Sequence, residues 1–338
     1  MSESDAHRRC PRGVGAALAV IPAVAALSGC ETAQSILNPA NTVASSIARL
    51  WWVMLWVAAG ISLITFGLAL YTVLRPARHQ LGFSPRIIII AGGLIWPAAL
   101  LLPLLAYAVA HGHGMLSQPS EAGALEVHVT GHQWWWEIRY PDVDGAPIYD
   151  ANELHIPAGR PVDVILTGAD VIHSFWVPRL GGKRDALPGT TTVVRLTAEQ
   201  PGVFRGQCAE FCGAQHARMV VHVTAHSEAQ FNRRMRRMAR MPRGDDGGRN
   251  ALGRAAFGRL CAHCHSVDPR VRGNRGPNLA AVAERLWLGA GALKNGDGAL
   301  LEWLQLHQTY KPGNRMPSHN LVDDDTRAAI AAFLENLR

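Results

Sequence analysis

Charge is absent from two long stretches of this sequence. Residues 50–74 and 87–110 contain no Asp, Glu, Lys or Arg. Because an α-helix rises about 1.5 Å per residue, each stretch is long enough to cross a hydrocarbon layer about 30 Å thick. Two buried helices of a soluble protein are the alternative, but the complete lack of charge favours two membrane-spanning helices.

The segment between the two uncharged stretches carries three arginines, Arg75, Arg78 and Arg86. Positively charged loops are retained on the cytoplasmic side of a membrane. The hairpin is therefore predicted to place both of its ends on the outer, periplasmic face of a bacterial plasma (inner) membrane. The long remainder of the chain would lie on the same face.

Cysteine is also scarce, and each of the six residues has an assignment. Cys10 and Cys30 lie near the N-terminus, where a basic segment precedes an apolar stretch, 14–27, that is too short to span a membrane. This order is typical of an export signal. The run Leu27-Ser-Gly-Cys30 resembles a bacterial lipoprotein cleavage site, which predicts a signal peptide over 1–29 and lipidation of Cys30. Ordinary cleavage nearby, or none, is the alternative.

A large excess of one charge is missing too. The net charge is +7, and much of it comes from the segment 233–243. The sequence contains no nucleic-acid-binding motif and no internal repeat, so no nucleic-acid partner is expected. Methionines recur at a spacing of three in a predicted helix over 231–241, which is more typical of packing than of metal binding.

What the chain does have is a dense cluster of soft metal ligands. Two thiols, an imidazole and a thioether lie within the twelve residues 208–219, and a further histidine lies upstream in an apolar segment. Sulfur ligands together with imidazole select copper, zinc or iron. With one backbone carbonyl, the set suits two copper ions bridged by two thiolates. The candidate ligands are His173, Cys208, Glu210 (carbonyl), Cys212, His216 and Met219.

Two plainer interpretations of this cluster compete with copper. Two Cys and two His could hold a tetrahedral structural zinc, which would leave Met219 unused. A disulfide between Cys208 and Cys212 is compatible with an oxidising compartment, but it would leave both histidines and Met219 without a role. Copper uses the whole set and is preferred.

These residues resemble those of subunit II of the haem–copper oxidases, the subunit that carries the dinuclear CuA centre. The resemblance extends through His132-Gln-Trp-Trp-Trp136, Asp170-Val-Ile-His-Ser174 and Lys183-Arg-Asp-Ala-Leu-Pro-Gly189, and covers roughly residues 45–226. It implies that the five candidate side chains and one carbonyl are CuA ligands. These are His173, Cys208, Cys212, His216 and Met219, with the backbone carbonyl of Glu210.

The resemblance also implies roles for two further groups. The Glu210 carboxylate would bind a magnesium ion shared with subunit I. Trp134, the first of the three consecutive indoles, would be the residue at which electrons enter from cytochrome c.

A second chemical motif is Cys261-Ala-His-Cys264-His265, whose spacing is that of covalent c-type haem attachment. Each Cys would form a thioether with the haem, and His265 would ligate its iron. Downstream come Gly276-Pro-Asn-Leu279, Lys311-Pro-Gly-Asn-Arg-Met316 and a predicted helix over 323–337. This order resembles a class I cytochrome c, an all-α domain in which Met316 would be the second axial ligand.

A Met/His ligand pair raises the reduction potential of a haem relative to a His/His pair, as an electron carrier that feeds copper requires. His307 and His319 are rival axial ligands. Their plainer interpretation is that of surface histidines beside the haem.

Alternating apolar residues between the two metal motifs predict strands over 125–130, 162–166, 191–196 and 219–224. Several short strands separated by turn residues favour an all-β sandwich or barrel, and the resemblance implies a cupredoxin-like fold. The candidate copper ligands would lie in the loop between two late strands, with His173 arriving from an earlier one.

The predicted fold class is multidomain, with a two-helix transmembrane hairpin, an all-β cupredoxin-like CuA domain and an all-α cytochrome c domain. After the signal peptide, the predicted boundaries are 30–115 for the N-terminal segment and hairpin, 116–227 for the CuA domain, 228–249 for a basic helix and linker, and 250–338 for the cytochrome c domain.

One position departs from the family pattern. Many subunits II carry a glutamate in the second span at the mouth of a proton channel, three residues before a Trp. Here that position is Gly93, and 87–110 contains no carboxylate. Because intramembrane carboxylates are costly and functional, their absence leaves open how protons enter the complex.

Taken together, the resemblances imply subunit II of a terminal cytochrome c oxidase, an oxidoreductase and translocase, with its own c-type haem. Electrons would pass from this haem through CuA to haem a in subunit I, where O2 is reduced to water with proton pumping. Subunits I and III, and a soluble cytochrome c or bc complex as donor, would be the partners. The alternatives are the subunit that admits electrons to a CuA-type nitric oxide reductase, and a copper-handling haem lipoprotein.

Overall fold

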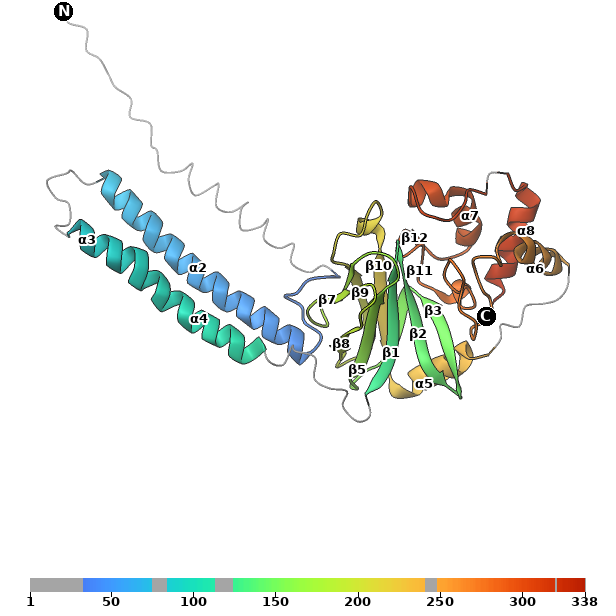
Figure 1. Cartoon of the computed structure of the whole chain (residues 1–338), viewed down its shortest axis with the longest axis horizontal. Helices are drawn as coiled ribbons and strands as arrows, with labels where there is room; N and C mark the ends of the chain where they lie inside the picture. The colour runs from blue at the N-terminus through green and yellow to red at the C-terminus, as the bar shows by residue number, and fades with distance from the viewer. Residues whose placement is uncertain (1–32, 75–83, 113–123, 241–247, 320, 338) are drawn as a thin grey trace, which may run out of the picture.

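The computed structural model describes residues 33–74, 84–112, 124–240, 248–319 and 321–337. Two long apolar helices, a β-sandwich and a C-terminal helical domain follow one another along the chain (Figure 1). This order confirms the predicted fold class. The predicted signal peptide with Cys30, and the loop arginines Arg75 and Arg78, lie outside the described residues.

The first long helix, α2 (Thr42–Leu74), begins eight residues before the predicted span. The cause is Asn41, whose side-chain oxygen accepts a hydrogen bond from the Ala44 amide at 2.7 Å. The Asn41 amide donates to the carbonyls of Leu180 (2.8 Å) and Thr197 (2.6 Å) in the β-sandwich. One buried side chain therefore starts the helix and ties it to the sandwich.

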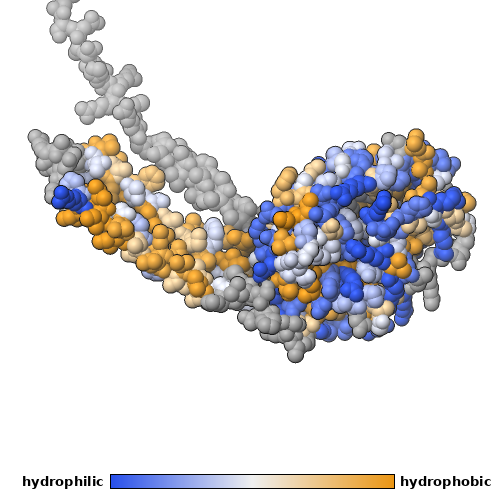
Figure 2. Space-filling view, in the orientation of Figure 1, coloured by the Kyte–Doolittle hydropathy of each residue, from blue (hydrophilic) through white to orange (hydrophobic). Residues whose placement is uncertain are grey.

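The second long helix is not uniform. It consists of α3 (Pro85–Ile87), the π-helical segment η3 (Ile88–Ile95) and α4 (Trp96–Gly112). Gly93 lies within the π-helical segment, a wide-turn conformation that apolar patterning does not predict. Both helices are long and apolar enough to cross a membrane, and they form an apolar rod beside the more polar globular part (Figure 2).

Two five-stranded sheets form the sandwich, in the orders β3-β2-β1-β5-β8 and β4-β10-β9-β6-β7. Their strands are β1 (Leu125–His132), β2 (Trp135–Val143), β3 (Ala146–Ala151), β4 (Glu153–Pro157), β5 (Val162–Gly168), β6 (His173–Trp176), β7 (Arg184–Ala186), β8 (Thr192–Leu196), β9 (Gly202–Cys208) and β10 (Val220–His226).

Alternation explains which strands the sequence predicted. In β1 every second residue from Val127 is buried, and Trp136, Ile138 and Phe175 fill the space between the sheets. The short strand β4 was not predicted, although its sequence, Glu-Leu-His-Ile-Pro, also alternates polar and apolar residues. All five residues are nevertheless buried, because its polar face is covered by a distant segment whose backbone amides at 286 and 287 donate to Glu153.

A short amphipathic helix, α5 (Glu228–Met238), closes one edge of the sandwich. Ser227 and Gln230 form a capping box at its N-terminus. Phe231, Met235 and Met238 are buried in the sandwich core, which confirms that the methionine spacing serves packing. Met241 lies outside the described residues.

The C-terminal domain is built from α6 (Arg249–Leu260), α7 (Ala299–Tyr310) and α8 (Asp324–Glu335), with the short hairpin β11 (Trp287–Leu288) and β12 (Leu293–Lys294). The predicted C-terminal helix is confirmed, with Asp323 as its N-cap. The α6 and α8 helices cross closely because Gly253 has no side chain at the crossing. A Cβ there would lie 2.0 Å from the Ala329 carbonyl oxygen.

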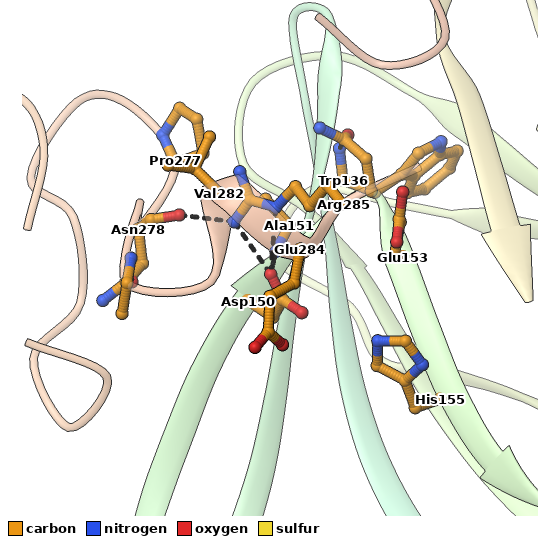
Figure 3. A network of polar contacts seen from close by, with 12 residues as sticks. Trp136, Asp150, Ala151, Glu153, His155, Pro277, Asn278, Val282, Glu284 and Arg285 are labelled. Atoms are coloured by element: carbon orange, nitrogen blue, oxygen red, sulfur yellow. Dashed lines mark hydrogen bonds and ion pairs between the residues drawn. The ribbon is translucent and has the colours of Figure 1, made fainter. Parts of the chain in front are cut away.

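This C-terminal domain docks on the sandwich beside β3, β4 and β10 (Figure 1). At the centre of the contact, Arg285 forms an ion pair of 2.8 Å with Asp150, and both side chains are almost completely buried. Figure 3 shows Arg285 reaching across to Asp150 and also bonding the Asn278 carbonyl of its own domain. Beside them, the Glu153 carboxylate accepts hydrogen bonds from two backbone amides of the hairpin segment, at 286 and 287.

Main-chain contacts extend the same interface. The Tyr149 amide donates to the Pro269 carbonyl at 2.9 Å, and the Val220 amide donates to the Ala290 carbonyl at 3.0 Å. The rings of His222 and Trp287 lie parallel, 6.0 Å apart. Buried polar groups with partners across the seam give the two domains a defined relative position.

Candidate metal centres

The candidate copper ligands converge at one end of the sandwich. His173 opens β6, Cys208 ends β9 and Met219 directly precedes β10. Strands β6 and β9 are neighbours, with Phe175 opposite Cys208. The distant histidine is therefore brought beside residues 208–219, the segment that carries the sulfur ligands and is called the sulfur loop below. Sheet pairing thus assembles a cluster that is dispersed in the sequence.

The two thiols form the centre of this cluster, with sulfur atoms 3.8 Å apart. Cys208 Sγ lies 3.9 Å from His173 Nδ1 and 3.3 Å from the Glu210 carbonyl oxygen. Cys212 Sγ lies 3.7 Å from His216 Nδ1 and 3.9 Å from Met219 Sδ. Each sulfur therefore has one imidazole and one weaker donor beside it.

This donor set fits two soft metal ions better than one. Six donors exceed the four of a structural zinc site, and both thiols are free rather than joined in a disulfide. Metal binding requires thiolates. The contact between the two thiols lowers the pKa of Cys208 and raises that of Cys212, so Cys208 is the first of the pair to ionise. The residues present therefore fit a pair of copper ions, although their role as ligands stays a prediction.

An acidic side chain orients the histidine from the far side of its ring. His173 is fully buried, and its Nε2 lies 2.9 Å from Asp170 Oδ1, which leaves Nδ1 directed at the sulfur. Asp170 is held in turn by the Gln133 amide at 2.8 Å. A Cβ at Gly131 would lie 2.7 Å from the His173 ring, so only glycine leaves room for the imidazole here.

The predicted site of electron transfer into this cluster, Trp134, contacts the sulfur loop directly. Its indole Nε1 donates to the Cys212 carbonyl at 2.9 Å, and the Gln133 side chain donates to the same oxygen at 2.8 Å. Gly213 has φ +113°, and a Cβ there would press on the indole at 3.2 Å. The ring is half-buried. Its predicted role is compatible with this position.

The Glu210 carboxylate pairs with Lys183 at the surface. Its Oε2 lies 3.4 Å from Lys183 Nζ, and the side chain is 45% exposed. One exposed carboxylate is a partial magnesium site at most, because Mg²⁺ takes about six oxygen ligands. The shared magnesium ion stays a prediction that depends on ligands from another chain.

The candidate haem-attachment residues follow α6. Cys261 and Cys264 are free and half-buried. His265 Nδ1 donates to the Pro277 carbonyl at 2.8 Å, which leaves Nε2 available to a metal. Burial lowers the pKa of His265, so the ring is neutral, as ligation requires. These features fit a covalently held haem.

Three residues were candidates for the opposite axial position. Met316 is half-buried and packs against the core of the C-terminal domain. His307 Nδ1 is engaged by the Asn314 amide at 3.1 Å, and its ring lies 5.5 Å from that of His319. His319 Nδ1 is buried and has no partner among the described residues. A structural role thus fits His307, and Met316 stays the predicted ligand with His319 as its rival.

The sequence did not single out two residues that join the two candidate centres, Lys311 and Arg315. Both lie in the segment that carries Met316, and both contact the strand turn that carries Trp134. Spacing gave no signal for them, because their partners are backbone and side-chain atoms about 180 positions away.

Comparisons with known proteins agree with this architecture. The family "Cytochrome C oxidase subunit II, periplasmic domain" matches residues 148–226, and the family "Cytochrome c" matches residues 250–338. A cytochrome c oxidase subunit 2 of Bacillus sp. strain PS3 is 30% identical over 267 residues, which cover 72% of this chain and 74% of that protein.

The cytochrome c oxidase subunit 2 of Alkalihalophilus pseudofirmus is 35% identical over 213 residues, which cover 63% of this chain. The chain spans 61% of that relative's length. Among solved structures, the periplasmic domain of subunit II of cytochrome oxidase from Bradyrhizobium japonicum is 33% identical with a TM-score of 0.32, and covers 33% of this chain and 91% of its own.

Proposed function

The chain belongs to the cytochrome c oxidase subunit 2 family, and from this membership we propose that it carries electrons from its own c-type haem to a dinuclear copper centre and on to subunit I. Subunit I would hold haem a and the site of oxygen reduction, coupled to proton pumping. The copper pair and the haem, when bound, supply one-electron redox chemistry; the chain supplies their positions.

One observation carries this proposal. Six donors of the kinds that copper binds come from two distant segments, and four of them lie around the other two, the thiols of Cys208 and Cys212. Redox ligands held by a rigid β scaffold change little when the oxidation state changes, which keeps electron transfer fast. The His173–Asp170 bond fixes one imidazole in this way.

Each remaining residue has a part in the proposal. Cys261 and Cys264 attach the haem, His265 and Met316 ligate its iron, and Trp134 lies between the haem-bearing domain and the sulfur loop. The Glu210 carboxylate is left for a magnesium ion at the interface with subunit I.

The same proposal assigns a location and partners. Two apolar helices and the family identify a membrane protein, and we place both metal domains on the periplasmic face. Subunit III, and a soluble cytochrome c or a bc complex that reduces the haem, complete the assembly. Because Gly93 replaces a carboxylate, proton uptake would depend on other subunits or other residues.

The test is low-temperature EPR of the full oxidised chain matured with copper and haem. We expect a hyperfine pattern from one unpaired electron shared equally by two copper nuclei, beside a low-spin haem signal. A pattern from a single copper, or bound copper without any such signal, would overturn the electron-transfer proposal in favour of a copper-handling role.

A further inference from the structure

Lys311 is one of only three lysines among the 33 basic residues of this chain, and it is the only buried one. Its backbone amide ends α7 by bonding the His307 carbonyl at 2.8 Å. From there its side chain leaves the haem-bearing domain and enters the seam with the sandwich, where it is 4% exposed.

Three backbone carbonyls surround the Lys311 ammonium. Nζ donates to the Trp134 oxygen at 2.6 Å, to the Arg218 oxygen at 2.9 Å and to the Gly289 oxygen at 3.0 Å. Burial lowers the pKa of Lys311 from 10.5 to about 7. In the ammonium form all three of its N–H donors have an acceptor. Two acceptors belong to the sandwich and the third to the haem-bearing domain.

The two acceptors in the sandwich lie in the segments that surround the candidate copper centre. Trp134 bonds the Cys212 carbonyl through its indole. Arg218 directly precedes Met219, and its guanidinium returns to the Tyr310 carbonyl beside Lys311. Lys311 therefore contacts both the turn that carries Trp134, the predicted entry residue, and the segment that carries the candidate copper ligand Met219. It also lies five residues before the predicted haem ligand Met316.

We propose that Lys311 is a positioning residue that holds the haem-bearing domain in one pose over Trp134 and the sulfur loop. This inference deepens the proposed function and rests on it for its kinetic part. A buried ammonium is stable only when its donors have hydrogen-bond acceptors. Two of the three acceptors, the carbonyls of Trp134 and Arg218, are within reach only when the domains are docked. Separating the domains breaks the set.

The exposed charged side chains nearby cannot hold the two domains in one pose in the same way. Arg315 bonds the Gln133 side chain and lies 3.7 Å from Asp170, but its side chain is 64% exposed. Exposed pairs contribute little and are screened by salt. The buried Lys311 contacts are far less sensitive to ionic strength.

The test compares Lys311→Met with Lys294→Met in the full chain loaded with copper and haem. Lys294 lies in the same domain and is exposed. Its substitution therefore removes the same charge without removing a hydrogen bond between the two domains. Pulsed EPR gives the distribution of distances between the oxidised haem and the oxidised copper centre. We expect one narrow distribution in the wild type and in Lys294→Met, and a broad one in Lys311→Met.

Electron transfer after flash photoreduction of the haem provides the kinetic readout. We expect the rate in Lys311→Met to fall by about tenfold or more, because small misplacements have large effects on reaction rates, while the haem absorption spectrum and copper EPR signal stay those of the wild type. Lys311→Gln keeps two N–H donors, so its electron-transfer rate should lie between those of the wild type and Lys311→Met. An unchanged distance distribution in Lys311→Met overturns the proposal.

A measurement on the unmodified chain guards against a variant that does not mature. Raising the ionic strength should leave the wild-type distance distribution narrow, because Lys311 and the Arg285–Asp150 pair, which join the two domains, are buried. Broadening with salt would instead assign docking to exposed pairs and overturn the role of Lys311. A narrow distribution with no electron transfer in the wild type would overturn the proposed function and leave the positioning role intact.

Discussion

The candidate copper ligands lie at one end of a sheet, on strands β6 and β9 and on the loop between β9 and β10, whereas the candidate haem ligands lie in segments of a small helical domain. On the copper side, Asp170 orients His173, and two side chains bond the Cys212 carbonyl. On the haem side, His265 has one such bond, to Pro277. Met316 packs against the domain core, and its backbone bonds the side chains of Asn314 and Gln308.

This difference separates two ways of preparing a metal site. Sheet pairing and buried polar contacts bring the copper donors together. The haem-bearing domain has a smaller core, into which a covalently bound haem would add a large apolar group. Copper should therefore bind to a preformed set of donors, whereas the haem-bearing domain should gain much of its stability from its cofactor.

The sharpest way to break the comparison is to remove one central sulfur. Cys212→Ser should abolish the shared-electron EPR signal and lower copper content by about half or more, because this thiol contacts both another thiol and two further donors. The haem spectrum should be unchanged. Copper analysis and EPR measure the effect, and an intact dinuclear signal would contradict the ligand assignment.

The seam between the two regions should give the next largest effect. Arg285→Met leaves Asp150 buried without its partner, which costs about 3–5 kcal/mol in comparable buried pairs. Arg272→Met is the matched control, because Arg272 pairs with Glu137 but is 53% exposed and should cost about 1 kcal/mol or less. Urea unfolding of the two variants, followed by haem absorption and by tryptophan fluorescence, measures both losses.

A pH dependence should arise from Glu153 at the same seam. Burial, with the neighbouring Asp150 charge, raises the pKa of Glu153 from 4.5 to about 7. The folded form then binds more protons than the unfolded form between these values, so stability falls as pH rises from about 4.5 to about 7. The loss is about 3.5 kcal/mol at most, at roughly 1.4 kcal/mol per unit of pKa shift.

Glu153→Gln removes this titration and should flatten that part of the profile. Urea midpoints measured across the window for both proteins give the difference directly. A wild-type profile that rises with pH through the window, relative to the variant, would show that the two backbone amides on Glu153 outweigh its burial.

The smallest expected effect tests how far the copper donors are preformed. Asp170→Asn keeps the shape of the side chain but loses the charge that orients His173. Loss of such an outer partner costs about 10–100-fold in metal affinity. Competition with a copper chelator measures the change, and Asp163→Asn, remote from the sulfur loop and paired with Arg195, is the control.

Local patterns in the sequence were enough for both metal motifs, for the two uncharged helices and for the alternating strands such as β1 and β5. They failed where burial or hydrogen bonding does not follow a simple period. The polar residues of β4 are buried by a segment more than 130 positions away. The π-helical turn around Gly93 leaves no apolar signature, and the start of α2 depends on contacts between Asn41 and residues about 140 and 156 positions away.

The sequence by itself determined which metal donors and which apolar helices the protein has, because thiols, imidazoles and uncharged runs can be recognised from short stretches of adjacent residues. Tertiary structure decided which of them meet. It set His173 beside Cys208, buried Arg285 against Asp150, and enclosed Lys311 between the two domains. The physical reason is that these contacts join groups far apart in the chain, whose proximity depends on sheet pairing and burial rather than on local spacing.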